Sequence, residues 1–267
     1  MLTLKLPIAS PIGTSIFVGL RSADVALQYS ILQRGWGASL IESLGGRALQ
    51  SSTIAGNGIL GLTPYATVVS AMALGSTVKQ LINLLLISEQ EMLPGAATAI
   101  SLINTVLNST NTLLSLWVVS SVGPTLTSPT ASIVNVVSSS PTLAAGAGLY
   151  ILGITIELYS EIQRKVFKSK PENKGKPYGG GLWSLATNIN YGGYTLWRSG
   201  YAMTAAGWPW GLAIGALFFY DFTSRAIPVM DEYCTKNVSL AQLLDALDPC
   251  IYDCCYWALL ISALGNE

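Results

Sequence analysis

The feature that most constrains this chain is a run of about 65 residues, from Met92 to Ile156, without any Asp, Glu, Lys or Arg. Such a run holds two helices of about 20 residues each and a connection, and about 20 apolar residues are what a helix needs to cross a bilayer. Further charge-free runs cover residues 48–78 and 199–220. The pattern predicts an integral membrane protein.

The overall composition agrees with this prediction. Charged residues make up 10% of the 267 residues and hydrophobic residues 51%, whereas soluble domains are about 25% charged. Low charge with high apolar content excludes intrinsic disorder. A net charge of zero argues against a nucleic-acid binder. We therefore expect the lipid bilayer as a partner and no nucleic acid.

The apolar runs, and the charged, glycine and proline residues that end them, predict an all-α helical bundle. It would have about five transmembrane segments in one domain, residues 1–267. The expected segments are Pro11–Leu32, Thr63–Ser88, Gly95–Val122, Thr142–Ser160 and Tyr191–Tyr220. Residues 125–141, rich in Ser, Thr and Pro, read as an exposed loop.

The last segment contains glycines at every fourth position. Gly207, Gly211 and Gly215 would let another helix pack very close. Pro209 lies among them, and a proline inside a helix predicts a kink.

The orientation in the membrane is predicted from residues 164–176. This stretch contains six of the 14 basic residues and one acidic residue, Glu172. Basic loops stay on the cytoplasmic side of a membrane. We therefore expect loop 164–176 to be cytosolic, with the protein in the endoplasmic reticulum.

Arg21, Asp24 and Lys79 are charged residues within predicted segments, where a charge is a functional candidate by default. Lys79 lies near an uncertain boundary, so we expect its long side chain to reach the membrane surface. Arg21 and Asp24 are three positions apart on a helix, so we expect them to neutralise each other.

The third segment carries a polar stripe. Its members recur at spacings of three and four, which places them on one helical face. They are Ser101, Asn104, Asn108, Asn111 and Ser115. Amides facing lipid would lack hydrogen-bond partners, so the stripe faces the interior of the bundle. There the amides either join helices by hydrogen bonds or line a cavity, in which Asn104, Asn108 and Asn111 would contact a substrate. The interpretation as inter-helix hydrogen bonds is favoured.

The fifth segment begins with a second stripe, Tyr191, Tyr194, Arg198 and Tyr201. Tyrosines beside a buried guanidinium suit an anionic or carbonyl-bearing ligand. The same spacing also fits an interfacial aromatic belt with an arginine that reaches toward the headgroups. The spacing alone does not choose between them.

Histidine is absent from the whole sequence. Its absence removes Ser-His-Asp and Cys-His catalysis, histidine-ligated metals and the commonest general base at neutral pH. The sequence has neither a cluster of carboxylates typical of a di-metal site nor a glycine loop of the phosphate-binding type. We therefore expect no metal.

Several motifs resemble a known family. They are Leu20–Asp24, Gln33–Gly37, Glu89–Met92, Asn173–Tyr178, Gly181–Trp183, Asn190–Tyr194, Leu196–Arg198, Asp221–Phe222 and Asp231–Cys234. Together they resemble a fungal membrane family within the steroid 5-alpha-reductase C-terminal superfamily, which includes sterol reductases and isoprenylcysteine methyltransferases. The resemblance covers residues 10–235, and the tail, residues 236–267, is unlike the family.

The resemblance implies NADPH-dependent reduction of a C=C bond in a hydrophobic, lipid-like small molecule such as a steroid, terpenoid or polyketide. Tyr191 would donate the proton. The residues expected to bind the cofactor are Lys174, Lys176, Tyr178, Asn190, Tyr194 and Arg198. Thr187-Asn188 stands where the superfamily has Arg-His, which removes two charge-assisted contacts to the cofactor.

Two other functions remain open on the same scaffold. One is a cofactor-free cyclase or isomerase, or a non-catalytic scaffold of a biosynthetic pathway. The other is an S-adenosylmethionine-dependent methyltransferase. A fold alone does not determine the reaction, so the scaffold does not choose among the three functions. The expected setting for all of them is lipid or secondary-metabolite biosynthesis.

Overall fold

The computed structural model describes residues 11–49, 59–88, 91–123, 132–173, 176, 178–186 and 188–228. Lys174 and the tail, residues 236–267, lie outside these ranges. The helices are α1 (Pro11–Gln33), α2 (Trp36–Ser43), α3 (Pro64–Ile82), α4 (Pro94–Leu116), α5 (Ile133–Ser138), α6 (Pro141–Lys168) and α7 (Ile189–Asp221). No described residue belongs to a strand, apart from one isolated bridge between Ala48 and Trp117. The predicted all-α class is confirmed.

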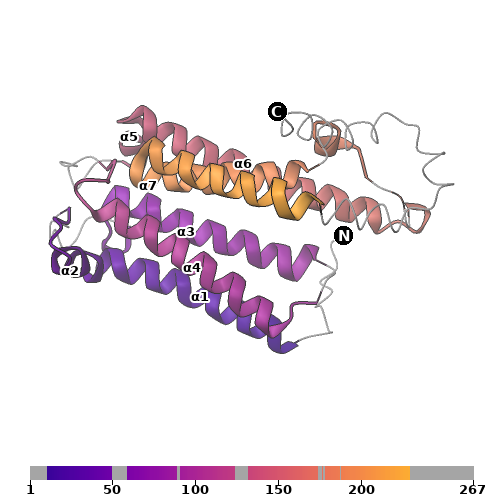
Figure 1. Ribbon diagram of the computed structural model, residues 1–267, viewed down its shortest axis with the longest axis horizontal. Helices are drawn as coiled ribbons and strands as arrows, with labels where there is room; N and C mark the ends of the chain where they lie inside the picture. The colour runs from indigo at the N-terminus through magenta and orange to yellow at the C-terminus, as the bar shows by residue number, and fades with distance from the viewer. Residues whose placement is uncertain are drawn as a thin grey trace.

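The long helices form two groups that lie against each other (Figure 1). Helices α1, α3 and α4 make one group, and α6 with α7 makes the other. Each of the five predicted segments corresponds to one long helix. Residues 125–141 are not simply a loop, because α5 occupies Ile133–Ser138. The basic stretch is not simply a loop either, since α6 continues through Lys168.

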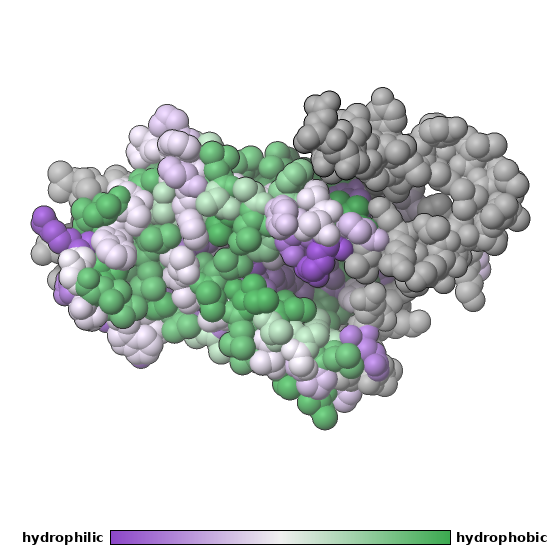
Figure 2. All heavy atoms as spheres, viewed as in Figure 1, coloured by the Kyte–Doolittle hydropathy of each residue, from purple (hydrophilic) through white to green (hydrophobic). Residues whose placement is uncertain are grey.

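Three helical stretches are long and apolar enough to cross a membrane: Pro64–Ile87, Pro141–Lys168 and Ile189–Ala226. Helices α1 and α4 have the length but carry more polar residues, which they bury against their neighbours. The outer face is largely hydrophobic (Figure 2), with exposed Leu102, Ile151 and Leu212. The chain is therefore an integral membrane protein.

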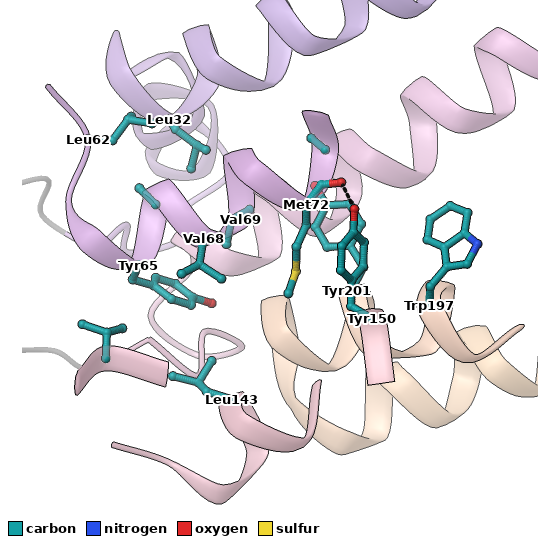
Figure 3. Packing of buried hydrophobic residues seen from close by; sticks show 13 residues of the cluster. Leu32, Leu62, Tyr65, Val68, Val69, Met72, Leu143, Tyr150, Trp197 and Tyr201 are labelled. Carbon is teal, nitrogen blue, oxygen red and sulfur yellow. Dashed lines mark hydrogen bonds between the residues drawn. The ribbon is translucent and has the colours of Figure 1, made fainter. Parts of the chain in front are cut away.

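The core between the two groups is a cluster of aliphatic and aromatic side chains (Figure 3). The Tyr150 hydroxyl of α6 donates a hydrogen bond to the Met72 carbonyl of α3 at 2.7 Å. Tyr65 of α3 donates to the carbonyls of Thr204 and Ala205 in α7 at 2.9 and 3.1 Å. Buried tyrosines thus join the two groups with apolar rings and satisfied hydroxyls.

Helix α7 folds back on itself. The stretch Ile189–Ala226 would be about 57 Å long as one straight helix, nearly twice the hydrocarbon thickness of a bilayer. The helical geometry breaks at Ala206 (φ −141°, ψ 24°) and Gly207 (φ 81°, ψ 179°). A left-handed φ favours glycine, so Gly207 makes the turn, two residues before the kink predicted at Pro209.

Two arms pack side by side: residues 189–205 of α7, and residues 208–226, which are the rest of α7 and the π-helical turn Phe222–Ala226 that continues it. Tyr191 stacks on Phe222 with ring centroids 4.6 Å apart. The Ser199 hydroxyl donates to the Gly211 carbonyl at 2.7 Å. Gly211 and Gly215 face Ser199 of the first arm. The close helix packing predicted from these glycines therefore occurs within α7 itself.

The hairpin predicts that both ends of α7 lie on the same side of the membrane. In a variant without the four native cysteines, Ser184→Cys and Ser224→Cys are expected to react with an impermeant maleimide from the same side. Val119→Cys is expected to react from the other side, because residue 119 lies at the end of the bundle where Val122 meets Gly207. Labelling of the first two from opposite sides would contradict the hairpin.

The first arm of α7 lies against α6 at very short range. A Cβ added to Gly153 of α6 would lie 2.4 Å from the Trp197 nitrogen and 2.6 Å from the Gly193 oxygen. A Cβ on Gly200 would lie 2.5 Å from the Tyr150 nitrogen. Small residues allow membrane helices this backbone contact, and it brings Asn190 and Trp197 of the first arm within hydrogen-bonding distance of α6.

Candidate functional site

The polar stripe of α4 is buried inside the bundle. Asn104, Asn108 and Asn111 are 3%, 0% and 4% exposed. Asn111 accepts a hydrogen bond from the Trp210 indole at 2.8 Å, and Asn104 accepts one from Gln80 of α3 at 2.8 Å. The three amides therefore hydrogen-bond to other helices. Their role in lining a substrate stays a prediction.

Arg21 and Asp24 of α1 form a buried ion pair, as the sequence predicted. The N–O distance is 2.7 Å, and neither side chain is exposed. Asp24 also accepts hydrogen bonds from Gln28 and Asn108, each at 2.8 Å. Arg21 donates to the Thr77 hydroxyl at 2.8 Å. One carboxylate thus organises polar groups from α1, α3 and α4.

Arg198 enters the same region from the first arm of α7. Its side chain donates to Asn104, to Asn108 at 3.3 Å and to the Tyr194 hydroxyl at 3.1 Å. The guanidinium lies 4.3 Å from the Trp197 ring centroid. Because the residue is only 1% exposed, the alternative of an arginine that reaches the membrane surface is wrong.

Lys79 is buried as well, so the expectation that it reaches the membrane surface is also wrong. It pairs with Glu157 of α6. The second oxygen of Glu157 accepts a hydrogen bond from the Trp197 indole at 2.6 Å. A carboxylate 78 positions away in the sequence supplies the compensation that a buried ammonium requires.

A third polar cluster lies where α7 begins. Asn190 donates to Glu161 of α6 at 2.8 Å, and Glu161 also pairs with Arg164. Arg164 lies over the Trp183 ring at 5.3 Å from the centroid. The side-chain oxygen of Asn190 is buried and has no hydrogen-bond partner among the described residues, so it is an acceptor available to a ligand.

Four aromatic rings stand beside this cluster. Tyr191 stacks on Phe222, and Tyr194 makes edge contacts with Phe218 and Phe222 at 5.1 and 5.4 Å between centroids. The rings come from both arms of α7, so the hairpin is what assembles them. Figure 2 shows hydrophilic side chains gathered in a recess between α7 and α3 on an otherwise mostly hydrophobic face.

Tyr178 is placed away from the other predicted cofactor residues. Its ring packs against Phe167 of α6 at 4.8 Å. Phe167 is six residues after Glu161, which places the two side chains about 120° apart around α6. Tyr178 and Lys170 line a separate groove of about 410 Å³ with apolar side chains of α6.

The predicted cofactor residues are therefore only partly brought together. Asn190, Tyr191, Tyr194 and Arg198 follow one another along the first arm. Tyr178 lies on another side of α6, Lys176 has no described contact with Asn190, and Lys174 lies outside the described residues.

Sequence reasoning missed the two acidic residues that join these clusters. Glu157 and Glu161 lie one turn apart in α6 and are each 7% exposed. Two carboxylates at this spacing in a long apolar segment were a visible signal, because intramembrane charges are rarely without a role. Within the described ranges, no three His, Cys, Asp or Glu residues are grouped so as to hold a metal ion.

Comparison with known proteins gives two matches. Residues 99–240 match a family described as a protein of unknown function (DUF1295). The chain is also 36% identical over 242 residues to the probable O-methyltransferase ustE of Ustilaginoidea virens, and the alignment covers 86% of this chain and 81% of the relative. No solved structure matches the chain.

Proposed function

The chain belongs to the DUF1295 family, and because it is also similar to the probable O-methyltransferase ustE along most of its length, we propose that it is a membrane-embedded, S-adenosylmethionine-dependent O-methyltransferase of a hydrophobic small molecule. The similarity to ustE along most of both chains carries the proposal. It also supports a role in the biosynthesis of a secondary metabolite. The third function left open by the sequence thus becomes the first.

The cluster at the start of α7 suits this cofactor. S-adenosylmethionine carries a sulfonium cation, an adenine ring and hydroxyl and ammonium donors. Glu161 offers a largely buried carboxylate, and the face of Tyr191 that is turned away from Phe222 would attract a cation. The unpartnered oxygen of Asn190 would accept a hydrogen bond from a hydroxyl or ammonium group.

Each residue then has a definite task. Asn190 and Glu161 hold the polar part of the cofactor, and the aromatic rings cover its apolar part and exclude water. The bound cofactor supplies an activated methyl group. The Tyr191 hydroxyl, on the same helical turn as Asn190, orients the acceptor oxygen. Holding both reactants in place accounts for much of the rate gain in a two-substrate reaction.

The NADPH-dependent reductase implied by the resemblance is the second candidate. It needs cations around the cofactor phosphates, and basic residues of 164–176 would have to provide them. Against it, Glu161 places a carboxylate beside Asn190, and Tyr178 lies on another side of α6. The cofactor-free cyclase or scaffold would need neither cofactor.

A binding titration distinguishes the three functions. Detergent-purified protein is expected to show saturable quenching of tryptophan fluorescence by S-adenosylhomocysteine at micromolar concentration, with Trp183 close to the site. NADPH is expected to bind more weakly. Saturation that prefers NADPH would support the reductase, and no binding of either by folded protein would support the cofactor-free alternatives.

The same titration tests the site. Asn190→Ala is expected to weaken binding of S-adenosylhomocysteine about tenfold, because it removes a hydrogen bond of about 1–1.5 kcal/mol. Asn135→Ala is the matched control, since Asn135 is exposed on α5. Equal affinities of the two variants would place the cofactor elsewhere.

A further inference from the structure

Among the described residues, and leaving aside the separate pair of Glu161 with the partly exposed Arg164, the buried centre of the bundle carries one more positive than negative charge. The nearly inaccessible cations are Arg21, Lys79 and Arg198, at 0%, 5% and 1% exposure. The carboxylates that face them are Asp24, paired with Arg21, and Glu157, paired with Lys79. Arg198 has only neutral hydrogen-bond acceptors among the described residues.

An unpaired guanidinium inside an apolar bundle is costly, because its loss of hydration is repaid only by a close negative charge. The aromatic rings around Arg198 offset little of this desolvation cost, because Trp197 and Tyr194 also lie within 6 Å of Lys79 and so interact with two cations at once. Asn108 moreover connects Arg198 to Asp24, the partner of Arg21, so the two cations lie in one hydrogen-bond network and repel each other. The centre therefore favours one additional negative charge.

Buried groups without partners lie in the same place. The Arg21 Nε and the Tyr201 hydroxyl have no hydrogen-bond partner among the described residues. Arg21 is joined to Arg198 through Asp24 and Asn108. Tyr201 is fully buried one turn after Arg198. Both unpartnered groups are hydrogen-bond donors, and an anionic oxygen is the acceptor that suits them.

We propose that Arg198, with Arg21 and Tyr201, binds the anionic oxygen of a hydrophobic small molecule: a carboxylate, or an ionised phenol or enol. Arg198 is eight residues after Asn190, or about 12 Å farther along the helix. The site therefore lies beyond the Asn190–Glu161 pair and adjoins the cofactor cluster through Tyr194, whose hydroxyl accepts a hydrogen bond from Arg198. It anchors one end of the substrate whether the group transferred at the other end is methyl or hydride.

The test compares a charged and a neutral ligand of the same shape. For the detergent-purified protein, 2-naphthoate at ten times its dissociation constant is expected to raise the unfolding midpoint by about 3–5 °C. The isosteric 2-naphthamide is expected to have little effect. An equal shift with the amide, or with chloride at the same concentration, would overturn the proposal.

Variants locate the site. Arg198→Gln is expected to weaken naphthoate binding at least tenfold and S-adenosylhomocysteine binding by a much smaller factor, because Arg198 reaches the cofactor cluster only through Tyr194. Arg225→Gln is the control, because Arg225 belongs to the same α7 region but its side chain is 70% exposed. Unchanged naphthoate affinity in Arg198→Gln would overturn the proposal and leave the proposed methyltransferase untouched.

Discussion

Gly153→Ala is expected to destabilise the protein by about 3 kcal/mol, although it adds a single methyl group. The new Cβ would lie 2.4 Å from the backbone nitrogen of Trp197 and 2.6 Å from the oxygen of Gly193. Backbone atoms cannot rotate away as a side chain does, so α6 and the first arm of α7 must separate. Overpacking costs about 1–3 kcal/mol in well-packed cores, and sometimes more.

Gly148→Ala is the matched control on the same helix. A Cβ at Gly148 meets no atom within 4 Å, and alanine is the better helix former by up to about 1 kcal/mol. Unfolding by SDS in a mixed micelle would measure both variants. Similar midpoints for the two would contradict the close contact between α6 and α7.

The separation of these helices would also reach the polar clusters. Glu157 follows Gly153 by one turn and accepts the indole hydrogen of Trp197. Moving α6 away from the first arm would lengthen this bond and disturb Arg198, which stacks on the same ring. We therefore expect Gly153→Ala to lower naphthoate affinity as well as stability, whereas Gly148→Ala lowers neither.

The five long helices were predictable from the sequence because each contains a long stretch with few or no charged residues. The stripe of Asn104, Asn108 and Asn111 was also predictable, since spacings of three and four have only one consequence in a helix. These are local properties. They depend on residues within a few turns of one another and not on the partner helix.

The hairpin in α7 was not predictable in the same way. Gly207 belongs to a regular four-residue glycine pattern, and nothing in that pattern distinguishes the glycine that turns from those that pack. Residues 199–220 carry no charge that would mark a surface turn. The conformation at Gly207 is decided by tertiary contacts, among them those of Tyr65 with the last carbonyls of the first arm.

In the candidate site, too, the local arrangement was predictable from the sequence and the contacts between distant residues were not. The order of Asn190, Tyr191, Tyr194 and Arg198 on one helix follows from sequence, and the buried pair Arg21–Asp24 follows from their spacing. The pairing of Lys79 with Glu157 and the position of Tyr178 on another side of α6 required the structure. Such contacts join residues tens of positions apart, and a single sequence contains no measure of them.

Asp24→Asn is expected to be among the most destabilising single changes in the bundle, at about 3–5 kcal/mol. Asp24 accepts hydrogen bonds from Arg21, Gln28 and Asn108 at 2.7–2.8 Å. Asparagine keeps the shape but removes the charge, which leaves Arg21 without a carboxylate. Breaking one side of a buried ion pair typically has a cost of this size.

Asp221→Asn is the control, because it breaks the exposed pair between Asp221 and Arg225. Exposed ion pairs contribute about 0–1 kcal/mol, so its midpoint in SDS unfolding should hardly move. If Asp24→Asn lost as little stability as Asp221→Asn, the prediction would be wrong, and Arg21 would have found another anion or contact with water.

The Asp24→Asn variant also bears on the inferred anion site. Without Asp24, the buried centre has two guanidiniums, one ammonium and only the carboxylate of Glu157. A bound anion should then compensate more of the charge, so 2-naphthoate is expected to raise the unfolding midpoint of this variant more than that of the original protein. The neutral amide should again have little effect, because it brings no charge. If naphthoate stabilises both proteins equally, the excess positive charge is not what attracts it.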